Sequence, residues 1–520
     1  MGKNASADGS TIVSYSADSY GLFGELYHYP AGMHKKGTLI DIHEWDTGKY
    51  LGQIAQARQT YNVIGNMNEF QLTIGETTFG GRPELVDTTG IIDYGSLIYL
   101  GLQRSRTARE AIKVMTELVQ EYGYYSGGES FTIADPNEIW IMEMIGKGPG
   151  VRGAVWVAVR VPDDCISAHA NQSRIHQFNM NDKENCMYSP DVISFAREKG
   201  YFDGVNKDFS FANAYAPLDF GARRYCEARV WSYFNMFTDR GNEFLPYILG
   251  ETNTPMPLFV KPNRKVSVQD VKNAMRDHYE GTPLDISKDF GAGPYHTPYR
   301  LSPLSFKVGD REYFNERPIS TQQSGFVFVA QMRSELPDPI GGVLWFGTDD
   351  ANMTVFTPVY CCTDKVPVCY TRVDGADYIT FSWNSAFWIF NWVANMVYPR
   401  YDLMMGDVRA TQTELETTFN EAQEGVEAAA AKLLEKDPAK AKAFLTNYTN
   451  MTAQSTFDTW KRLGEFLVVK YNDGVVKRMK NGQFERNSIG QPAGVIRPGY
   501  PKEFLEEYVK QTGDRYKMPE

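Results

Sequence analysis

The chain has 520 residues, of which 42% are hydrophobic and 13% aromatic, and its formal net charge is −11. Its lysines and arginines form no block, which argues against nucleic acids and anionic membrane surfaces as partners, because both are bound by clustered basic residues. The run closest to a membrane span, residues 379–397, is interrupted by three asparagines, so we expect a buried aromatic segment there.

Residues 10–180 are rich in short β-type runs separated by Gly, Asp and Asn. The predicted strands are Thr11–Ser16, Gly37–Ile42, Asn62–Ile64, Gln71–Ile74, Ser130–Ile133, Ile139–Met144 and Val155–Val161. One helix is predicted among them, from about Tyr94 to Tyr122, because apolar residues recur there every three or four positions. Asp93 is its expected N-cap and Gly123 its expected C-cap. Strands on both sides of a helix indicate a mixed α+β fold.

The rest of the chain is predicted to continue this pattern. Residues 185–290 are expected to be helical and loop-rich, with several prolines as breakers. A second group of strands is predicted at Gly325–Gln331, Gly342–Gly347, Thr354–Tyr360 and Tyr378–Ser382, followed by helices at Thr411–Glu435 and about Ala439–Asn472. No clean linker divides the chain. We therefore expect one domain over residues 1–405 with an insertion at about 185–290, and a helical extension over 406–520 packed on the same core.

The six cysteines form no metal-binding pattern, since Cys361-Cys362 followed by Cys369 has no partner CxxC. Free buried thiols are the expected state, and a disulfide from Cys361 or Cys362 to Cys369 is the alternative if the protein is exported. The seven histidines include no HExxH; His169 and His176 with Asp163 and Asp164 form only a weak metal pattern. No G-x-S-x-G elbow or phosphate-binding loop occurs.

The first 18 residues carry a specific motif. Gly2-Lys3-x-Ala5-Ser6-x-Asp8-Gly9-Ser10, followed by a β-type run and Asp18, resembles the start of the dipeptidase A family of cysteine-type N-terminal-nucleophile (Ntn) hydrolases. Members of that family begin with a pattern like C-T-x-x-x-V-G-K-x-A-S-x-D-G-S. Further similar segments lie at 66–82, 167–175 and 331–347. The resemblance implies an α+β fold built as a four-layer αββα sandwich.

The resemblance also implies a reaction. The side chain of an N-terminal Cys is the nucleophile and its α-amine, with an ordinary pKa of about 8, is the base. Small peptides would be hydrolysed through an acyl-enzyme, with no metal or organic cofactor. Met1 stands where the family has Val, so the Cys is expected just upstream of Met1 and the 520-residue chain by itself is expected to be inactive. The alternatives are an Ntn acylase or amidase on N-acyl substrates, and a catalytically dead binding protein.

The family motifs suggest site residues. Asp18 is expected to orient the amine, with a turn cap as the alternative, although Ser14-Tyr15-Ser16-Ala17 departs from the Arg that relatives often carry before it. Asn171 is the expected oxyanion donor. The expected substrate-binding residues are Arg174, Glu76, Thr77, Arg224 and Arg229, where arginines would bind a carboxylate and Glu76 and Thr77 lie near a second oxyanion donor.

Three properties stay open at this level. The dipeptide preference and the oligomeric state, monomer or homo-oligomer, are not determined by the motifs. The chain as it reads is expected to be cytoplasmic, because Met1 is followed by no signal peptide. A periplasmic or secreted location is the expectation if a signal peptide and the Cys precede Met1.

Overall fold

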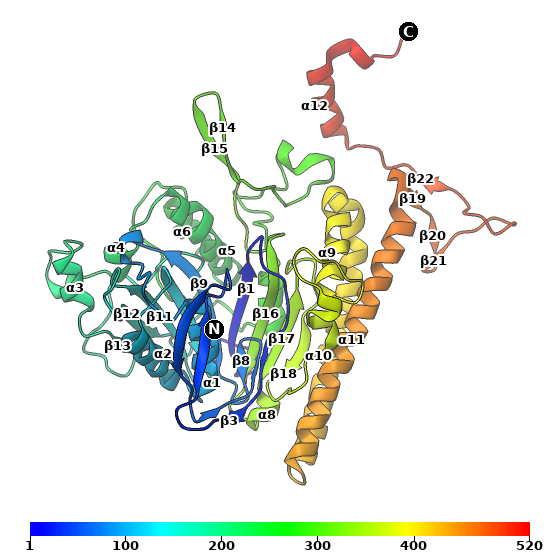
Figure 1. Cartoon of the computed structure of the whole chain (residues 1–520). Helices are drawn as coiled ribbons and strands as arrows, with labels where there is room; N and C mark the ends of the chain where they lie inside the picture. Colours follow the sequence, from blue (N-terminus) through cyan, green and yellow to red (C-terminus); the bar gives the residue numbers. More distant parts are fainter.

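The computed structural model describes residues 1–520 and contains two antiparallel sheets that face each other (Figure 1). The smaller sheet has the order β1 (Thr11–Asp18), β16 (Ser324–Met332), β17 (Val343–Thr348) and β18 (Thr357–Tyr360). The larger sheet has the order β13 (Cys186–Tyr188), β12 (Ala154–Arg160), β11 (Ile139–Gly146), β10 (Gly128–Ala134), β9 (Thr73–Gly80), β8 (Met67–Asn68), β7 (Val63–Ile64) and β2 (His28–Tyr29). Strand β1 packs against β9 and β10, which brings the two sheets together.

Helices cover the outer side of each sheet (Figure 1). Helices α1 (Tyr94–Arg104) and α2 (Ala108–Tyr122) pack on the larger sheet and bury a cluster of 23 apolar residues against it. The helices on the smaller sheet are α9 (Ala386–Val397), α10 (Tyr401–Leu434) and α11 (Pro438–Tyr471). Every residue of β11, β16, β17 and β18 is buried, as expected for strands covered on both faces. The fold is therefore mixed α+β.

The helix predicted over residues 94–122 is two helices. Asp93 caps α1 by accepting from the Ser96 amide, and Gly123 ends α2 at a φ of 81°. Between them Ser105 is extended, and the Thr107 side chain accepts from the Glu110 amide to start α2. The Asn68 amide donates to two carbonyls at the end of α1, so both new helix ends are satisfied.

The insertion contains α3 (Val192–Glu198), α4 (Phe211–Tyr215), α5 (Ala228–Phe237), α6 (Gly241–Ile248) and α7 (Val268–Ala274). It is helical and loop-rich, as the sequence predicts. The predicted strand Tyr378–Ser382 is wrong: only an isolated bridge joins Asp377 and Thr380. The Asp377 carboxylate accepts from the Ile379 amide and forms a turn, and Ile379 is 91% exposed. The buried aromatic segment begins only with α9.

The C-terminal helices start earlier than predicted, because α10 begins at Tyr401 and the expected boundary at residue 405 lies inside it. Asp437 caps α11 by accepting from two backbone amides. Residues 472–520 follow the helices and contain no buried residue. The remaining elements are β3 (Gly32–Met33), β4 (Leu39–His43), β5 (Tyr50–Ala55), β6 (Gln59–Thr60), β14 (Ser305–Val308), β15 (Arg311–Phe314), α8 (Asp338–Gly341), β19 (Val476–Lys477), β20 (Met479–Lys480), β21 (Gln483–Phe484), β22 (Val495–Ile496) and α12 (Lys502–Thr512).

All six cysteines are free, and all but Cys165 are buried, which excludes the alternative disulfide in this structure. None of the helices combines the length and the apolar composition that a membrane span requires.

Candidate active site

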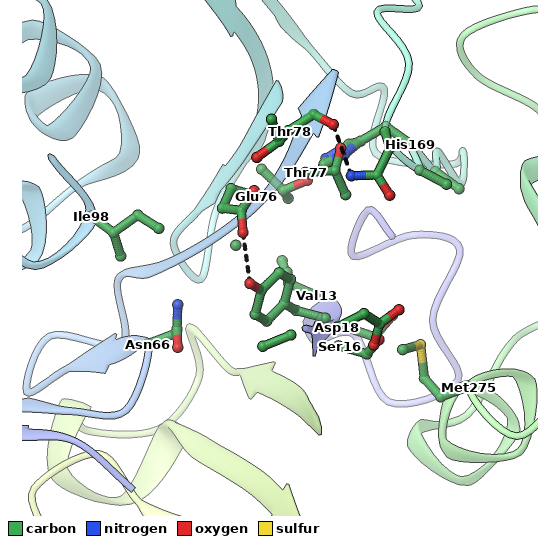
Figure 2. Close-up of a pocket in the computed structure, with 18 of the residues that line it drawn as sticks. Val13, Ser16, Asp18, Asn66, Glu76, Thr77, Thr78, Ile98, His169 and Met275 are labelled. Carbon is green, nitrogen blue, oxygen red and sulfur yellow. Dashed lines mark hydrogen bonds between the residues drawn. The ribbon is translucent and has the colours of Figure 1, made fainter. Parts of the chain in front are cut away.

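A cavity of about 530 Å³ lies between the two sheets, bordered by β1, β9, α1 and α5 (Figure 2). Its size is typical of sites for small ligands. Five of the residues expected to form a site line it: Asp18, Glu76, Thr77, Asn171 and Arg229. They come from segments that are distant in the sequence, and the packing of the two sheets brings them together.

One edge of β1 runs along the cavity. Met1 and Ile12 exchange both backbone hydrogen bonds, with 2.7 Å from the Met1 amine to the Ile12 oxygen and 3.1 Å in the other direction. In an antiparallel pair, every second residue directs its backbone groups to the same edge, so Ser14 and Ser16 face the same side as Ile12. Every residue from Ile12 to Ser19 lines the cavity. Burial lowers the pKa of the Met1 α-amine to about 5.

Asp18 lies at the end of β1, just after a register shift in its pairing with β16. A bulge of this kind re-aims the side chain that follows it. The carboxylate accepts from the hydroxyls of Ser16 at 2.6 Å and Ser324 at 2.7 Å, and Arg317 lies 3.4 Å from its other oxygen. Two hydroxyls and a cation therefore hold a negative charge at the rim of the cavity. Arg317 was not predicted, because nothing local in the sequence connects it to Asp18.

Asn171 is held rigidly by its backbone and its side chain. It adopts the left-handed conformation with a φ of 61°. Its amide nitrogen donates to the Thr78 carbonyl at 2.8 Å, and its oxygen accepts from Arg229 at 2.9 Å. A carboxamide nitrogen carries two hydrogens, so one N–H is left to donate to a ligand. This geometry suits a neutral donor with a fixed direction.

His169 is a neutral imidazole on the wall of the cavity. The sequence places it only in a weak metal pattern. One ring nitrogen bonds the Thr77 hydroxyl and the other bonds the Thr132 hydroxyl, each at 2.7 Å. Burial, aided by the positive charge of Arg174, lowers the pKa of His169 to about 3. The ring thus joins β9 to β10 as a hydrogen-bonded brace on the cavity wall.

Glu76 and Glu129 form a buried carboxyl pair on β9 and β10. Glu76 accepts from the Tyr15 hydroxyl at 2.6 Å (dashed line at Glu76 in Figure 2), and Glu129 accepts from the Thr78 hydroxyl at 2.7 Å. Burial raises the pKa of both groups, and the nearby charge of Glu76 raises the pKa of Glu129 well above its ordinary value. Glu129 was not predicted, since nothing local in the sequence pairs it with Glu76.

Arg174, Arg224, Arg229 and Arg317 differ in where they lie relative to the cavity. Arg229 and Arg317 line the cavity. Arg174 does not: it is buried beside Glu227 at 2.9 Å and donates to the backbone carbonyls of Ala168 and Pro257. Arg224 also lies outside the cavity, where it pairs with Glu316. The contacts of Arg174 and Arg224 thus do not place them against a ligand in this cavity.

Comparison with known proteins gives the family. The model of peptidase family C69 matches residues 23–414, three quarters of the chain. The chain belongs to peptidase family C69. The predicted resemblance to the dipeptidase A family is thereby confirmed.

Three similar proteins illustrate the relationship of this C69 chain to others. A probable dipeptidase of Salmonella dublin is 29% identical over 388 residues, which cover 69% of this chain and 79% of the relative. A probable dipeptidase of Latilactobacillus sakei is 25% identical over 86% of this chain and 89% of its own length. Dipeptidase A of Lactobacillus helveticus is 24% identical over 75% and 79%, respectively.

The C69 chain places donors and charges around its cavity but no thiol. None of its six cysteines is among the cavity-lining residues. The side chains present can orient a carbonyl through Asn171, hold a carboxylate through Arg229 and Arg317, and hold a cationic group through Glu76. One cavity is thus lined by hydrogen-bond donors and by charged groups of both signs.

Proposed function

We propose that the protein is a dipeptidase whose nucleophile is a Cys carried on a strand that pairs with β1 along the cavity. Membership of a peptidase family and the names of the relatives support the substrate class. The observation that carries the proposal is the backbone pairing of Met1 with Ile12. That pairing sets the register of any residues that precede Met1.

The register can be counted. Met1 lies opposite Ile12, so each step back from Met1 is one step forward along β1, and the residue five places before Met1 lies opposite Ala17. The family pattern C-T-x-x-x-V has its Cys five places before the position that Met1 occupies. Side chains directly opposite each other in an antiparallel pair share a face. The Cys would therefore point to the side of Ala17 and Tyr15, whose hydroxyl contacts Glu76 in the cavity.

The surrounding residues have roles consistent with this position. The Cys thiolate attacks the peptide carbonyl carbon, and the N–H of Asn171 that Thr78 does not use stabilises the oxyanion. The α-amine of the same Cys takes the thiol proton and returns it to the leaving amine as the C–N bond breaks. Water then releases the acyl group. Asp18 is close enough to Ala17 to hold the protonated amine, and Arg229 and Arg317 bind the carboxylate of the second residue.

The layer arrangement supports the same assignment. We infer that the two facing sheets with helices on both outer sides are the αββα sandwich of the Ntn hydrolases. In that architecture the nucleophile is the first residue of a strand at the interface between the sheets. Strand β1 and its free edge lie at this interface.

The test is to place the Cys in register. A chain with Cys-Thr-Val-Ile-Val before Met1, its Cys exposed by removal of a leader, is expected to hydrolyse dipeptides. The matched Ala-Thr-Val-Ile-Val chain should be slower by on the order of 10³-fold or more. Liberated amino acids are measured under identical conditions for both proteins.

A second control tests the register itself. One extra residue between the Cys and Met1 moves the thiol opposite Asp18 and onto the other face of the strand. This chain should lose most of the activity while it keeps the thiol and the fold. The proposal would be contradicted if the proteins with five and with six added residues were equally active. It would also be contradicted if the protein with five added residues had no activity.

A further inference from the structure

Glu76 is a buried carboxylate that faces the cavity without a cation. Its side chain lines the cavity, and the residue is only 7% exposed. The basic side chains that line the cavity are His169, Arg229 and Arg317; none of them forms an ion pair with Glu76, whose hydrogen-bond partner is the Tyr15 hydroxyl. A buried charge without a counter-ion is costly in free energy. A ligand that brings a positive charge would remove that cost.

Glu129 stands behind Glu76 and completes the site. It is fully buried, its Oε1 accepts from the Thr78 hydroxyl at 2.7 Å, and its Oε2 has no hydrogen-bond partner. The two carboxyl groups lie close enough for the charge of Glu76 to raise the pKa of Glu129. Two such groups share one proton, because both cannot be ionised side by side in a buried site. Glu129 is fully buried and does not line the cavity, whereas Glu76 does, so the proton belongs on Glu129 and the negative charge on Glu76.

The same cavity also carries the complementary sign. Arg229 has no carboxylate partner: its guanidinium donates to the carbonyls of Ala170 and Tyr225 and to Asn171. Arg317 stands near it beside Asp18. A cavity lined both by a carboxylate without a cation and by a guanidinium without a carboxylate partner matches a small zwitterion.

We infer that Glu76, held by the Tyr15 hydroxyl, binds the free α-ammonium of the substrate, so that the protein selects peptides with an unblocked N-terminus. Glu129 acts through Glu76 and is a positioning residue. The inference rests on the proposed function and extends it, because it distinguishes a dipeptidase from an acylase on N-acyl substrates. An N-acyl amide has no positive charge and would leave Glu76 unpaired.

The test is a binding measurement on the 520-residue chain, which needs no nucleophile and is therefore independent of the Cys experiment. Isothermal titration calorimetry compares Leu-Leu with N-acetyl-Leu-Leu. The N-acetylated peptide is expected to bind at least about 30-fold more weakly, the range for loss of one partner of a buried charge pair. Equal binding of the two peptides would overturn the inference and leave the Cys proposal standing.

Variants separate recognition from folding. Glu76→Gln should reduce the discrimination between the two peptides to less than about threefold, whereas Glu129→Gln should keep it, because a neutral amide replaces a neutral acid of the same shape. Glu84→Gln, an exposed position outside the cavity, is the matched control. Circular dichroism verifies the fold of each variant. If Glu76→Gln retains the full discrimination, Glu76 is not the ammonium site.

Discussion

Glu143 shows how one buried side chain fixes the loop that carries Asn171. Its carboxylate accepts from the Ser173 hydroxyl and from the backbone amides of Arg174 and Ile175. Burial raises the pKa of Glu143 to about 7 in spite of these donors. The Arg174 side chain anchors the same loop to Glu227 from the other side. Through these contacts, Arg174 positions the loop that carries Asn171.

His169 gives a pH-dependent prediction at the residue scale. Its pKa is about 3 in the folded state against 6.5 for an ordinary histidine, so between these values the unfolded chain binds a proton that the folded chain does not. The free energy of unfolding therefore falls as the pH falls from 6.5 towards 3. His169→Gln removes this contribution. The difference in stability, wild type minus variant, should rise with pH over this window and be flat above it.

Urea unfolding at a series of pH values measures that difference. Comparison with the variant is needed because other groups titrate in the same range, among them Glu143, whose raised pKa acts in the opposite direction. A difference that does not change between pH 4 and 6.5 would show that His169 is protonated in the folded protein.

At the scale of elements, two buried ion pairs attach α10 to the rest of the molecule. Arg333, at the end of β16, donates twice to Glu427 at 2.6 and 2.8 Å. Arg276, just after α7, pairs with Glu416 at 2.5 Å. Both acids are on the side of α10 that faces the smaller sheet. The helix is otherwise rich in Ala, Glu and Thr, so these pairs fix its position and rotation along with its apolar contacts.

Glu427→Ala is predicted to lower the free energy of unfolding by about 3–5 kcal/mol, because it leaves the buried Arg333 charge without its partner. The control is Glu424→Ala, one turn away on the exposed side of α10, which should change stability by less than about 0.5 kcal/mol. Both are measured by urea denaturation. Similar losses in the two variants would mean that the Arg333 pair contributes no special stability.

At the scale of the whole molecule, the chain divides into a packed body and a C-terminal arm. The arm, residues 472–520, stands away from the body in Figure 1 and contains no buried residue. Its contacts with the body include a hydrogen bond from Tyr295 to the Gly499 carbonyl and the stacking of Phe290 on Phe504. The expected extension over 406–520 thus consists of two parts. Helices α10 and α11 pack on the core, and the arm of residues 472–520 does not.

Removal of residues 475–520 is predicted to change the free energy of unfolding by less than about 1 kcal/mol and to leave Leu-Leu binding unchanged, because no buried surface depends on them. Removal of everything after Leu434 is the contrasting deletion. It takes away α11 with the buried Leu445, Trp460 and Leu467, and that chain should not fold cooperatively. Urea unfolding and calorimetry test both. Loss of folding in the shorter deletion would contradict this division.

Much of the fold could be read from local patterns. Alternation and apolar periodicity located most strands and helices, and the caps follow from local chemistry, because the Asp93 side chain accepts a backbone bond and Gly123 tolerates a positive φ. Errors arose where a local signal was overridden, as at Ser105, where tertiary bonds from Asn68 end α1 early. The strand predicted at Tyr378–Ser382 is wrong for a local reason, because the Asp377 carboxylate accepts from the Ile379 amide and forms a turn.

The sequence by itself determined the family, the mixed α+β class and the segments that reach the site. These properties depend on motifs and patterns formed by residues that are close together in the chain. Only the tertiary structure decided which of those residues meet. Arg317 beside Asp18, Glu129 behind Glu76 and His169 between two threonines are pairings across strands and sheets, which no spacing along the chain encodes. The shifted pKa values of Glu129 and His169 follow from burial, and burial exists only once the two sheets have packed.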